Sequence, residues 1–339
     1  MRNSIIPVLL GLTMLISACG ERPVKNDQQE AETAQAVDLL AQLRQQAEKQ
    51  PDNAMIYNEM ALYFLSRENF SDALHNINIS LELEPSNTAH YITLSDIYLM
   101  MGDAQRAQLT LYRAMELEPA SASIYVHLGR LQVYMEDYPR AFENLRKALE
   151  LDRNNSSAYF WRGIAWLERG DTTRAISDWQ LAVAYDPESF DGYFQLGMLM
   201  AERKDRFALD YLDHALRLAP SDPELIYDIG MAFQEIERYN KAIETYNHIL
   251  SIDPCFYKAL YNKGYISLVI TGEYEAAIRY FGEALDCKPD YADALFNRGL
   301  AYELLEDYAN ARKDYRETLL LRTNYPKAIE ALNRLDEIQ

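Results

Sequence analysis

The chain has 339 residues, of which 49% are apolar and 25% are charged, and its formal net charge is −19. This composition is typical of a folded protein, and the length allows two average domains or one long repeat array. The acidic balance argues against binding of nucleic acid and against adhesion to an anionic lipid surface, because both need clustered Lys and Arg. With 13 Gly and 12 Pro but 25 Tyr, the sequence favours a helical array with aromatic packing.

The amino end combines a positive charge with a short apolar segment. Arg2 precedes the apolar residues 5–17, which are too few to span a membrane as a helix and fit the apolar region of a secretory signal peptide. Residues 16–19 then read Ile-Ser-Ala-Cys. This tetrad resembles the bacterial lipobox, in which the peptidase cuts before the cysteine and the cysteine carries the lipid.

The lipobox resemblance implies a lipoprotein signal peptide at residues 1–18 and an acylated Cys19, with chains such as palmitate. The alternative is an ordinary signal peptide with a chance cysteine. Gly20 takes the place where enterobacterial-type lipoproteins retained in the inner membrane carry Asp, so the resemblance implies sorting to the outer membrane. The polar residues 19–30 are expected to form a flexible tether, followed by an N-terminal capping helix over 31–50.

The rest of the chain repeats one pattern with a period of 33 to 35 residues. A proline, or the residue that replaces it, marks each period at Pro51, Pro85, Pro119, Arg153, Pro187, Pro220, Pro254, Pro289 and Thr323. Eight repeats follow, over 51–84, 85–118, 119–152, 153–186, 187–219, 220–253, 254–288 and 289–322. The fifth repeat is one residue short in its central turn, and the seventh is one residue long.

Each repeat has a small residue in its first half and an alanine in its second half. The first series is Ala61, Ser95, Gly129, Gly163, Gly197, Gly230, Gly264 and Gly299, and the second is Ala73, Ala107, Ala141, Ala175, Ala208, Ala242, Ala277 and Ala311. This pattern resembles the tetratricopeptide repeat, in which small residues let two antiparallel helices approach closely. The resemblance implies an all-α fold, an α/α superhelical solenoid of eight helix hairpins, closed by a C-terminal capping helix over 323–339.

No motif of an enzyme or of a metal site is found in the sequence. It lacks GxxxxGK[ST], GxGxxG and HExxH, and its five histidines lie singly at positions 75, 90, 127, 214 and 248. We therefore expect no catalytic activity, no cofactor and no bound metal.

Two cysteines remain besides Cys19. Cys255 opens the first helix of the seventh repeat and Cys287 closes its second helix, and these two ends are neighbours in an antiparallel hairpin. An exported protein meets an oxidising compartment, which favours a disulfide. The sequence leaves open a disulfide and a pair of unbonded thiols.

In tetratricopeptide arrays the first helices line a concave surface, and this resemblance implies where a partner would bind. The expected groove residues are large and apolar: Phe160, Ile164, Phe194, Met198, Tyr227, Met231, Tyr261, Tyr265, Phe296 and Leu300. An acidic flank is expected beside them, at Asp191, Glu202, Glu224, Asp228 and Glu235. Such a surface would favour a partner segment with Lys or Arg beside an apolar anchor. Five of the groove residues form an aromatic ladder, for which a purely structural stacking role is the alternative: Phe160, Phe194, Tyr227, Tyr261 and Phe296.

The sequence therefore predicts a non-enzymatic scaffold, lipid-anchored in the bacterial cell envelope, at the outer membrane and facing the periplasm. It would hold one or more envelope proteins in its groove, and a homodimer through the terminal helices is a further possibility. The rival interpretation is a binding protein for envelope glycans or muropeptides that uses concave-face aromatics, with Trp161 as the residue to watch.

Overall fold

The computed structural model describes residues 39–219 and 221–337. The predicted signal peptide, the lipidated Cys19, the tether and the first part of the N-terminal capping helix lie outside these residues. The chain divides into two compact halves between Gly192 and Tyr193. We call these the N-terminal half and the C-terminal half and describe each by itself.

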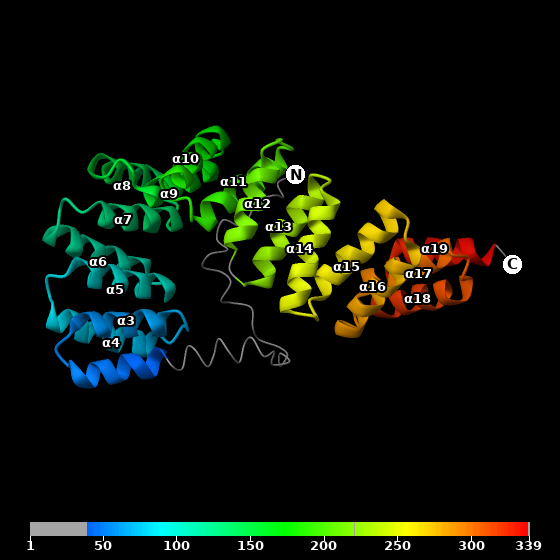
Figure 1. Ribbon diagram of the computed structural model, residues 1–339, viewed down its shortest axis with the longest axis horizontal. Coiled ribbons are helices and arrows are strands. Elements are labelled where there is room, and N and C mark those ends of the chain that lie inside the picture. Colours follow the sequence, from blue (N-terminus) through cyan, green and yellow to red (C-terminus); the bar gives the residue numbers. More distant parts are fainter. Residues whose placement is uncertain (1–38, 220, 338–339) are drawn as a thin grey trace. The chain divides into compact units, whose positions relative to one another are not determined.

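The N-terminal half consists of helix hairpins (Figure 1). Residues 39–49 are helical and are followed by α3 (Ala54–Leu65), α4 (Phe70–Leu83), α5 (Thr88–Met100), α6 (Ala104–Leu117), α7 (Ala122–Tyr134), α8 (Tyr138–Leu151), α9 (Ser156–Glu168) and α10 (Thr172–Tyr185). The helices pack in pairs, α3 with α4 through α9 with α10, and each pair contacts the next one along the chain. Stacked hairpins bury faces that no single hairpin could bury alone.

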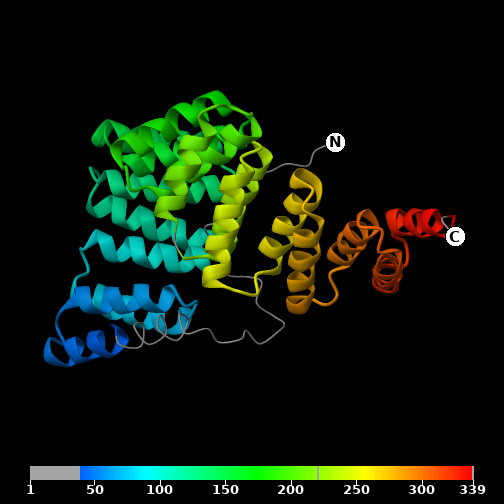
Figure 2. The same ribbon diagram turned by 45° about the vertical axis from the view of Figure 1, so that its right-hand side comes forward.

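Helix α11 (Phe190–Glu202) contains the division between the halves. The C-terminal half continues with α12 (Ala208–Leu218), α13 (Pro223–Glu235), α14 (Tyr239–Ile252), α15 (Tyr257–Tyr265), the π-helix η1 (Ile266–Thr271), α16 (Tyr274–Cys287), α17 (Ala292–Leu304), α18 (Tyr308–Leu321) and α19 (Pro326–Asp336). Figure 2 shows the same helices turned by 45°. Helices and turns, with no strand, make up residues 39–219 and 221–337, so the predicted all-α hairpin fold is confirmed.

Helix ends are fixed by local chemistry that recurs from repeat to repeat. Asn53 and Asp137, for example, accept hydrogen bonds from backbone N–H groups of the first turns of α3 and α8, which have no partner inside the helix. The turn between the two helices of each hairpin uses one residue with positive φ: Glu68, Gly102, Glu136, Gly170, Lys204, Glu237, Gly272 or Glu306. Such a left-handed residue ends a helix and reverses the chain.

The small residues stand at the closest approach of the paired helices. All eight alanines of the second series are 0% exposed. At Gly163 a Cβ atom would lie 2.4 Å from Trp179 Nε1, and at Gly299 it would lie 2.8 Å from Tyr315 Cε1. The expected reason for the pattern, close packing of two helices, therefore agrees with the geometry.

Substituting Gly163 by alanine tests this packing. The added Cβ must displace the fully buried Trp179, and such overpacking costs about 1–3 kcal/mol, partly offset by the higher helix propensity of alanine. We expect a lower midpoint of thermal unfolding by circular dichroism. Gly282→Ala is the control, because a Cβ there meets only the end of Arg298 at 3.9 Å. Equal midpoints for the two variants would contradict the packing argument.

Both ends of the array are closed by amphipathic helices. Leu43, in the helix over 39–49, is buried in a cluster with residues of α3 and α4. In α19, Ala328 and Leu335 are buried and Leu332 packs against the same cluster. These are the residues that the sequence places on the inner side of the terminal helices.

The extra residue of the seventh repeat is absorbed by a change of helix type. The first helix of this repeat changes after Tyr265 from α15 to the π-helix η1, and Gly272 then ends it with a φ of +70°. A π-helix has one more residue in each hydrogen-bonded turn, so it takes up an insertion without breaking the helix. The π-turn leaves Val269 and Ile270 exposed to solvent, at 53% and 42%.

Candidate protein-interaction surface

The aromatic ladder predicted on the first helices packs mainly inside the hairpins. Phe296 is 9% exposed, and its ring centroid lies 5.5 Å from that of Tyr315 in the second helix of the same repeat. Tyr261 stands in the same way 5.6 Å from Phe281. Phe194 is also buried, whereas Phe160 and Tyr227 are half-buried. The stacking role left open by the sequence therefore accounts for much of this ladder.

Two asparagines tie the ladder together from one repeat to the next. Asn262 of α15 donates a hydrogen bond of 3.0 Å to the Tyr227 hydroxyl of α13, and Asn297 of α17 donates one of 2.9 Å to the Tyr261 hydroxyl of α15. Burial raises the pKa of Tyr261 to about 12, which keeps the hydroxyl protonated. These hydrogen bonds hold successive first helices of the C-terminal half in register.

Asn262 also reaches the predicted groove methionine. Its Nδ2 also lies 2.8 Å from Met231 Sδ and 3.2 Å from the Tyr246 hydroxyl oxygen, so its two N–H groups are shared among three acceptors. Because sulfur accepts hydrogen bonds only weakly, the main effect is to hold the thioether in place beside the amide. The position of Met231 on α13 is thus fixed by a neighbouring repeat.

The predicted groove residues outside the aromatic ladder differ in exposure. Met231 and Tyr265 are exposed, at 38% and 36%, and Met198 and Leu300 are half-buried. Ile164 is 1% exposed, so it offers no surface to a partner. For Ile164, and likewise for the buried Phe194 and Phe296, the structure assigns packing and not an exposed groove position.

In the C-terminal half, the first helices α13, α15 with η1, and α17 each expose large apolar side chains in their carboxyl halves. We call Met231, Tyr265, Val269, Ile270 and Leu304 the apolar strip. Val269, Ile270 and Leu304 were not among the groove residues predicted from the sequence. The extra residue of the seventh repeat could have indicated that Val269 and Ile270 are exposed, because an insertion near a turn changes which side chains face solvent. For Leu304 we find no such signal.

Four of the predicted acidic residues lie on α11 and α13 of the C-terminal half. Lys258 donates to both carboxylate oxygens of Glu224 at 2.8 Å, so this predicted flank residue is paired. Asp228 is half-buried, and burial together with the charge of Glu224 raises the pKa of its carboxyl to about 6. Glu202 and Glu235 are exposed.

Asp191, the fifth predicted member of the flank, is exposed and belongs to the N-terminal half. Four of the five predicted acids thus lie in the half that carries the apolar strip.

The raised pKa of Asp228 predicts a pH-dependent stability. Folding favours the protonated carboxyl of Asp228. Its contribution to the free energy of unfolding is therefore fully present below about pH 4 and is lost as the pH rises through about 6. Asp228→Asn removes the cost of the buried charge and should stabilise the protein at pH 7.5 by about 1 kcal/mol, after allowance for solvent screening. Urea unfolding at pH 7.5 and pH 4.5 measures this, with Asp290→Asn, at an exposed site, as the control. No gain at pH 7.5, or an equal gain at both pH values, would refute the argument.

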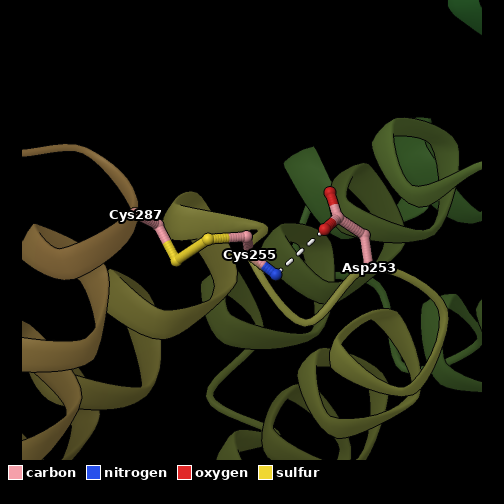
Figure 3. The surroundings of a disulfide bond; sticks show 3 residues. All are labelled: Asp253, Cys255 and Cys287. Carbon is pink, nitrogen blue, oxygen red and sulfur yellow. Dashed lines mark hydrogen bonds between the residues drawn. A yellow bond between two sulfur atoms is a disulfide. The ribbon is translucent and has the colours of Figure 1, made fainter. Parts of the chain in front are cut away.

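Cys255 and Cys287 form a disulfide in the structure (Figure 3). Cys255 lies just before α15 and Cys287 is the last residue of α16, and their Cα atoms are 5.5 Å apart. Asp253 Oδ1 accepts a hydrogen bond of 2.9 Å from the Cys255 backbone N–H, which shapes the turn before α15. The next residue, Phe256, packs with its ring centroid 5.6 Å from that of Tyr227. The disulfide therefore fixes a turn that contacts the preceding repeat.

Trp161 packs against neighbouring aromatic rings. It is half-buried, and its centroid lies 5.4 Å from those of Tyr134 and Phe160, edge-on to both. Trp179 is fully buried and donates from Nε1 to the Phe160 carbonyl at 3.1 Å. These contacts make Trp179 a packing residue and leave one part of Trp161 accessible.

Within residues 39–219 and 221–337, no group of three or more His, Cys, Asp or Glu side chains is placed to hold a metal ion. None of the helices in this described part is both long enough and apolar enough to cross a membrane.

Comparison with known proteins agrees with the repeat pattern. Tetratricopeptide-repeat family models match residues 127–193, 223–254 and 292–325, and a TPR-repeat model matches residues 267–305. The C-terminal part of a TPR repeat-containing protein from Cytophaga hutchinsonii superposes with a TM-score of 0.60. That alignment has 19% sequence identity and covers 71% of this chain and 99% of the other.

Two curated proteins show partial likeness. BBSome complex member BBS4 from Mus musculus is 30% identical over 102 residues, which cover 30% of this chain and 19% of that protein. The uncharacterized protein ycf37 from Guillardia theta is 26% identical over 128 residues, which cover 37% of this chain and 72% of that protein. The chain thus spans about a fifth of the length of the first of these relatives. The matched segments are tetratricopeptide repeats, and the fold is the helix-hairpin solenoid of tetratricopeptide-repeat proteins.

Proposed function

We propose that the protein is a non-enzymatic scaffold, anchored by a lipid in the bacterial cell envelope, that holds a partner protein on the apolar strip. Tetratricopeptide repeats generally serve as protein-interaction scaffolds, which gives the class of function. The observation that carries the proposal is that successive first helices of the C-terminal half each expose large apolar side chains, and exposed apolar surface of this kind marks binding sites.

The chemistry of the surface defines the partner segment. Met231 and Tyr265 offer large contact area at low entropic cost, and Val269, Ile270 and Leu304 extend it. The exposed carboxylates of Glu202 and Glu235 and the half-buried Asp228 favour positive charge nearby. We infer a partner segment that carries Lys or Arg next to apolar anchor residues.

Membrane attachment is proposed from the sequence at the amino end. The Ile-Ser-Ala-Cys tetrad supports acylation of Cys19, and Gly20 supports the outer membrane as the destination. The pairing of Cys255 with Cys287 supports an oxidising compartment, in which disulfides persist. Acyl chains contribute about 0.8 kcal/mol per buried methylene, so two or more anchor a protein stably.

The anchoring proposal is tested on the mature protein. Intact-mass analysis of protein purified from bacterial membranes should show a chain that begins at Cys19 and carries acyl chains. Cys19→Ala should move the protein out of the membrane fraction. A mature chain without acyl groups, or a variant that stays in the membrane, would reject the lipid anchor.

The binding proposal is tested by removing the apolar side chains without touching the core. A triple Ser substitution at Met231, Tyr265 and Leu304, all exposed members of the strip, should abolish recovery of the partners that co-purify with the unmodified protein. The matched control is a triple Ser substitution at Met101, Leu109 and Met135, which are equally large, exposed and located in the N-terminal half. Unchanged recovery in the first variant, or equal loss in both, would remove the support for this surface.

A further inference from the structure

Helices α8, α9 and α10 of the N-terminal half enclose a pocket lined by arginine side chains. Its volume is about 400 Å³, and its lining consists of Phe142, Arg146, Arg162, Trp166, Arg174, Ser177 and Asp178. Three cations and one carboxylate face this space, in a chain whose net charge is −19. Residues 138–178 hold seven Lys or Arg against six Asp or Glu, so the local charge balance is opposite to that of the whole chain.

An aromatic stack holds one arginine in place. Phe142 of α8 and Trp166 of α9 have ring centroids 4.1 Å apart, and the Arg174 guanidinium of α10 lies 4.5 Å from the Trp166 ring centroid. A guanidinium held over an indole ring by a cation–π contact still has N–H groups that point away from the ring and can donate to an oxyanion. The ion pair of Arg174 with Asp171 is long, 3.5 Å, and exposed. Asp171 therefore competes only weakly with a bound oxyanion for the Arg174 guanidinium.

A second arginine is fixed by a buried carboxylate. Arg162 donates from Nε and Nη2 to the two oxygens of Asp178, at 2.7 Å each, and the Asp178 side chain is only 7% exposed. Two of the five N–H groups of Arg162 are used in this way, so the guanidinium is oriented while donors remain. Arg146 pairs with Glu150 one helical turn away, at an exposed site.

We propose that this pocket binds a small organic oxyanion, a carboxylate or a phosphate monoester. Arg174 and Arg146 would contact the oxyanion, Arg162 would contribute a donor from the pocket wall, and the Ser177 hydroxyl would complete the set. Arginine suits this task because its planar fork matches the oxygens of both groups. The volume exceeds that of an inorganic anion, which leaves room for the organic part of the ligand. This site is separate in the chain from the apolar strip and does not depend on the proposed scaffold function.

The pocket contains its own reporter, because Trp166 is one of three tryptophans in the chain. The full chain is titrated with glycerol 3-phosphate and with glucuronate, and with glycerol and glucose as uncharged controls, at constant ionic strength. Tryptophan fluorescence should change saturably with one or both oxyanions and not with the neutral compounds. The tighter of the two probes identifies phosphate or carboxylate as the preferred group.

Substitutions separate this site from general anion binding. Arg174→Gln should weaken binding at least tenfold, since it removes a charge-assisted donor, and Arg146→Gln should weaken it less. Arg140→Gln, also on α8 but paired with Asp137 outside the pocket lining, should leave the dissociation constant unchanged. The absence of a saturable response, an equal response to sodium chloride, or equal affinity of Arg174→Gln and the unmodified chain would overturn the proposal.

Discussion

Replacing Asp314 by alanine is expected to destabilise the C-terminal half by about 2–3 kcal/mol, because it leaves the half-buried Arg298 without its counter-charge and without two hydrogen-bond acceptors. Arg298 of α17 donates from Nε and Nη2 to the two carboxylate oxygens of Asp314 in α18, at 2.7 and 2.8 Å. The Asp314 side chain is 3% exposed and the Arg298 side chain 22%, so water replaces the lost acceptors only in part. Urea unfolding followed by circular dichroism measures the change.

The control for this prediction is an exposed ion pair in the same half. Arg279 and Glu283 lie one turn apart on α16 at 3.9 Å, and both side chains are largely in solvent. Glu283→Ala should change stability by less than about 0.5 kcal/mol, as is usual for exposed pairs. If the two variants unfolded at the same urea concentration, the Arg298–Asp314 pair would not be a main support of the last hairpin.

Removal of the disulfide is the second change with a large expected effect. Cys255 and Cys287 are 32 residues apart in sequence, and closing a loop of this length contributes about 3–4 kcal/mol in the chain-entropy model. The double substitution Cys255→Ser and Cys287→Ser should therefore lower the thermal midpoint of the C-terminal half. The turn that carries Phe256 against Tyr227 should become more accessible to hydrogen exchange.

Reduction provides the matched control for the disulfide. A reducing agent should lower the midpoint of the unmodified protein to that of the double variant and should leave the variant itself unchanged. Titration of the denatured, purified protein should find no free thiol at Cys255 or Cys287. Two reactive thiols, or a variant as stable as the oxidised protein, would show that the pair is not bonded or does not contribute.

The hairpin fold could be predicted from the sequence because its cause is local and recurs in every repeat. Alanines such as Ala175 and glycines such as Gly163 mark the places where two helices touch, and their spacing fixes both helices and the turn. The terminal helices could be predicted for the same reason, since their apolar residues follow one helical face.

The candidate surface could be predicted only in part. Ile164 and Met231 occupy the same place in their repeats, yet one is 1% and the other 38% exposed. The repeat pattern is the same at both positions, so their different exposure comes from neighbouring side chains, which vary from repeat to repeat. Interactions such as the hydrogen bond from Asn262 to Tyr227 join residues 35 positions apart, and the repeat signature does not specify them.

The buried ion pairs were also beyond the sequence. The pair of Arg298 and Asp314 has the same geometry as the pair of Arg162 and Asp178 four repeats earlier. At the equivalent positions of the seventh repeat there is no such ion pair, and Lys263 lies 4.2 Å from the centroid of the Tyr280 ring. Carboxylates are so frequent in this chain that spacing alone does not single out the two that are buried. Only the helix packing shows which of them an arginine can reach.

The central claim, that the apolar strip holds a partner protein in the envelope, is tested most directly by crosslinking at a defined residue. A photoreactive amino acid is placed at Tyr265 in the strip and, as the comparison, at Glu283 on α16, and the bacteria are irradiated intact. We predict a discrete protein adduct from Tyr265 only, mapped by mass spectrometry to a segment with Lys or Arg beside apolar residues. The absence of an adduct at Tyr265, or the same adducts from both positions, would contradict the claim.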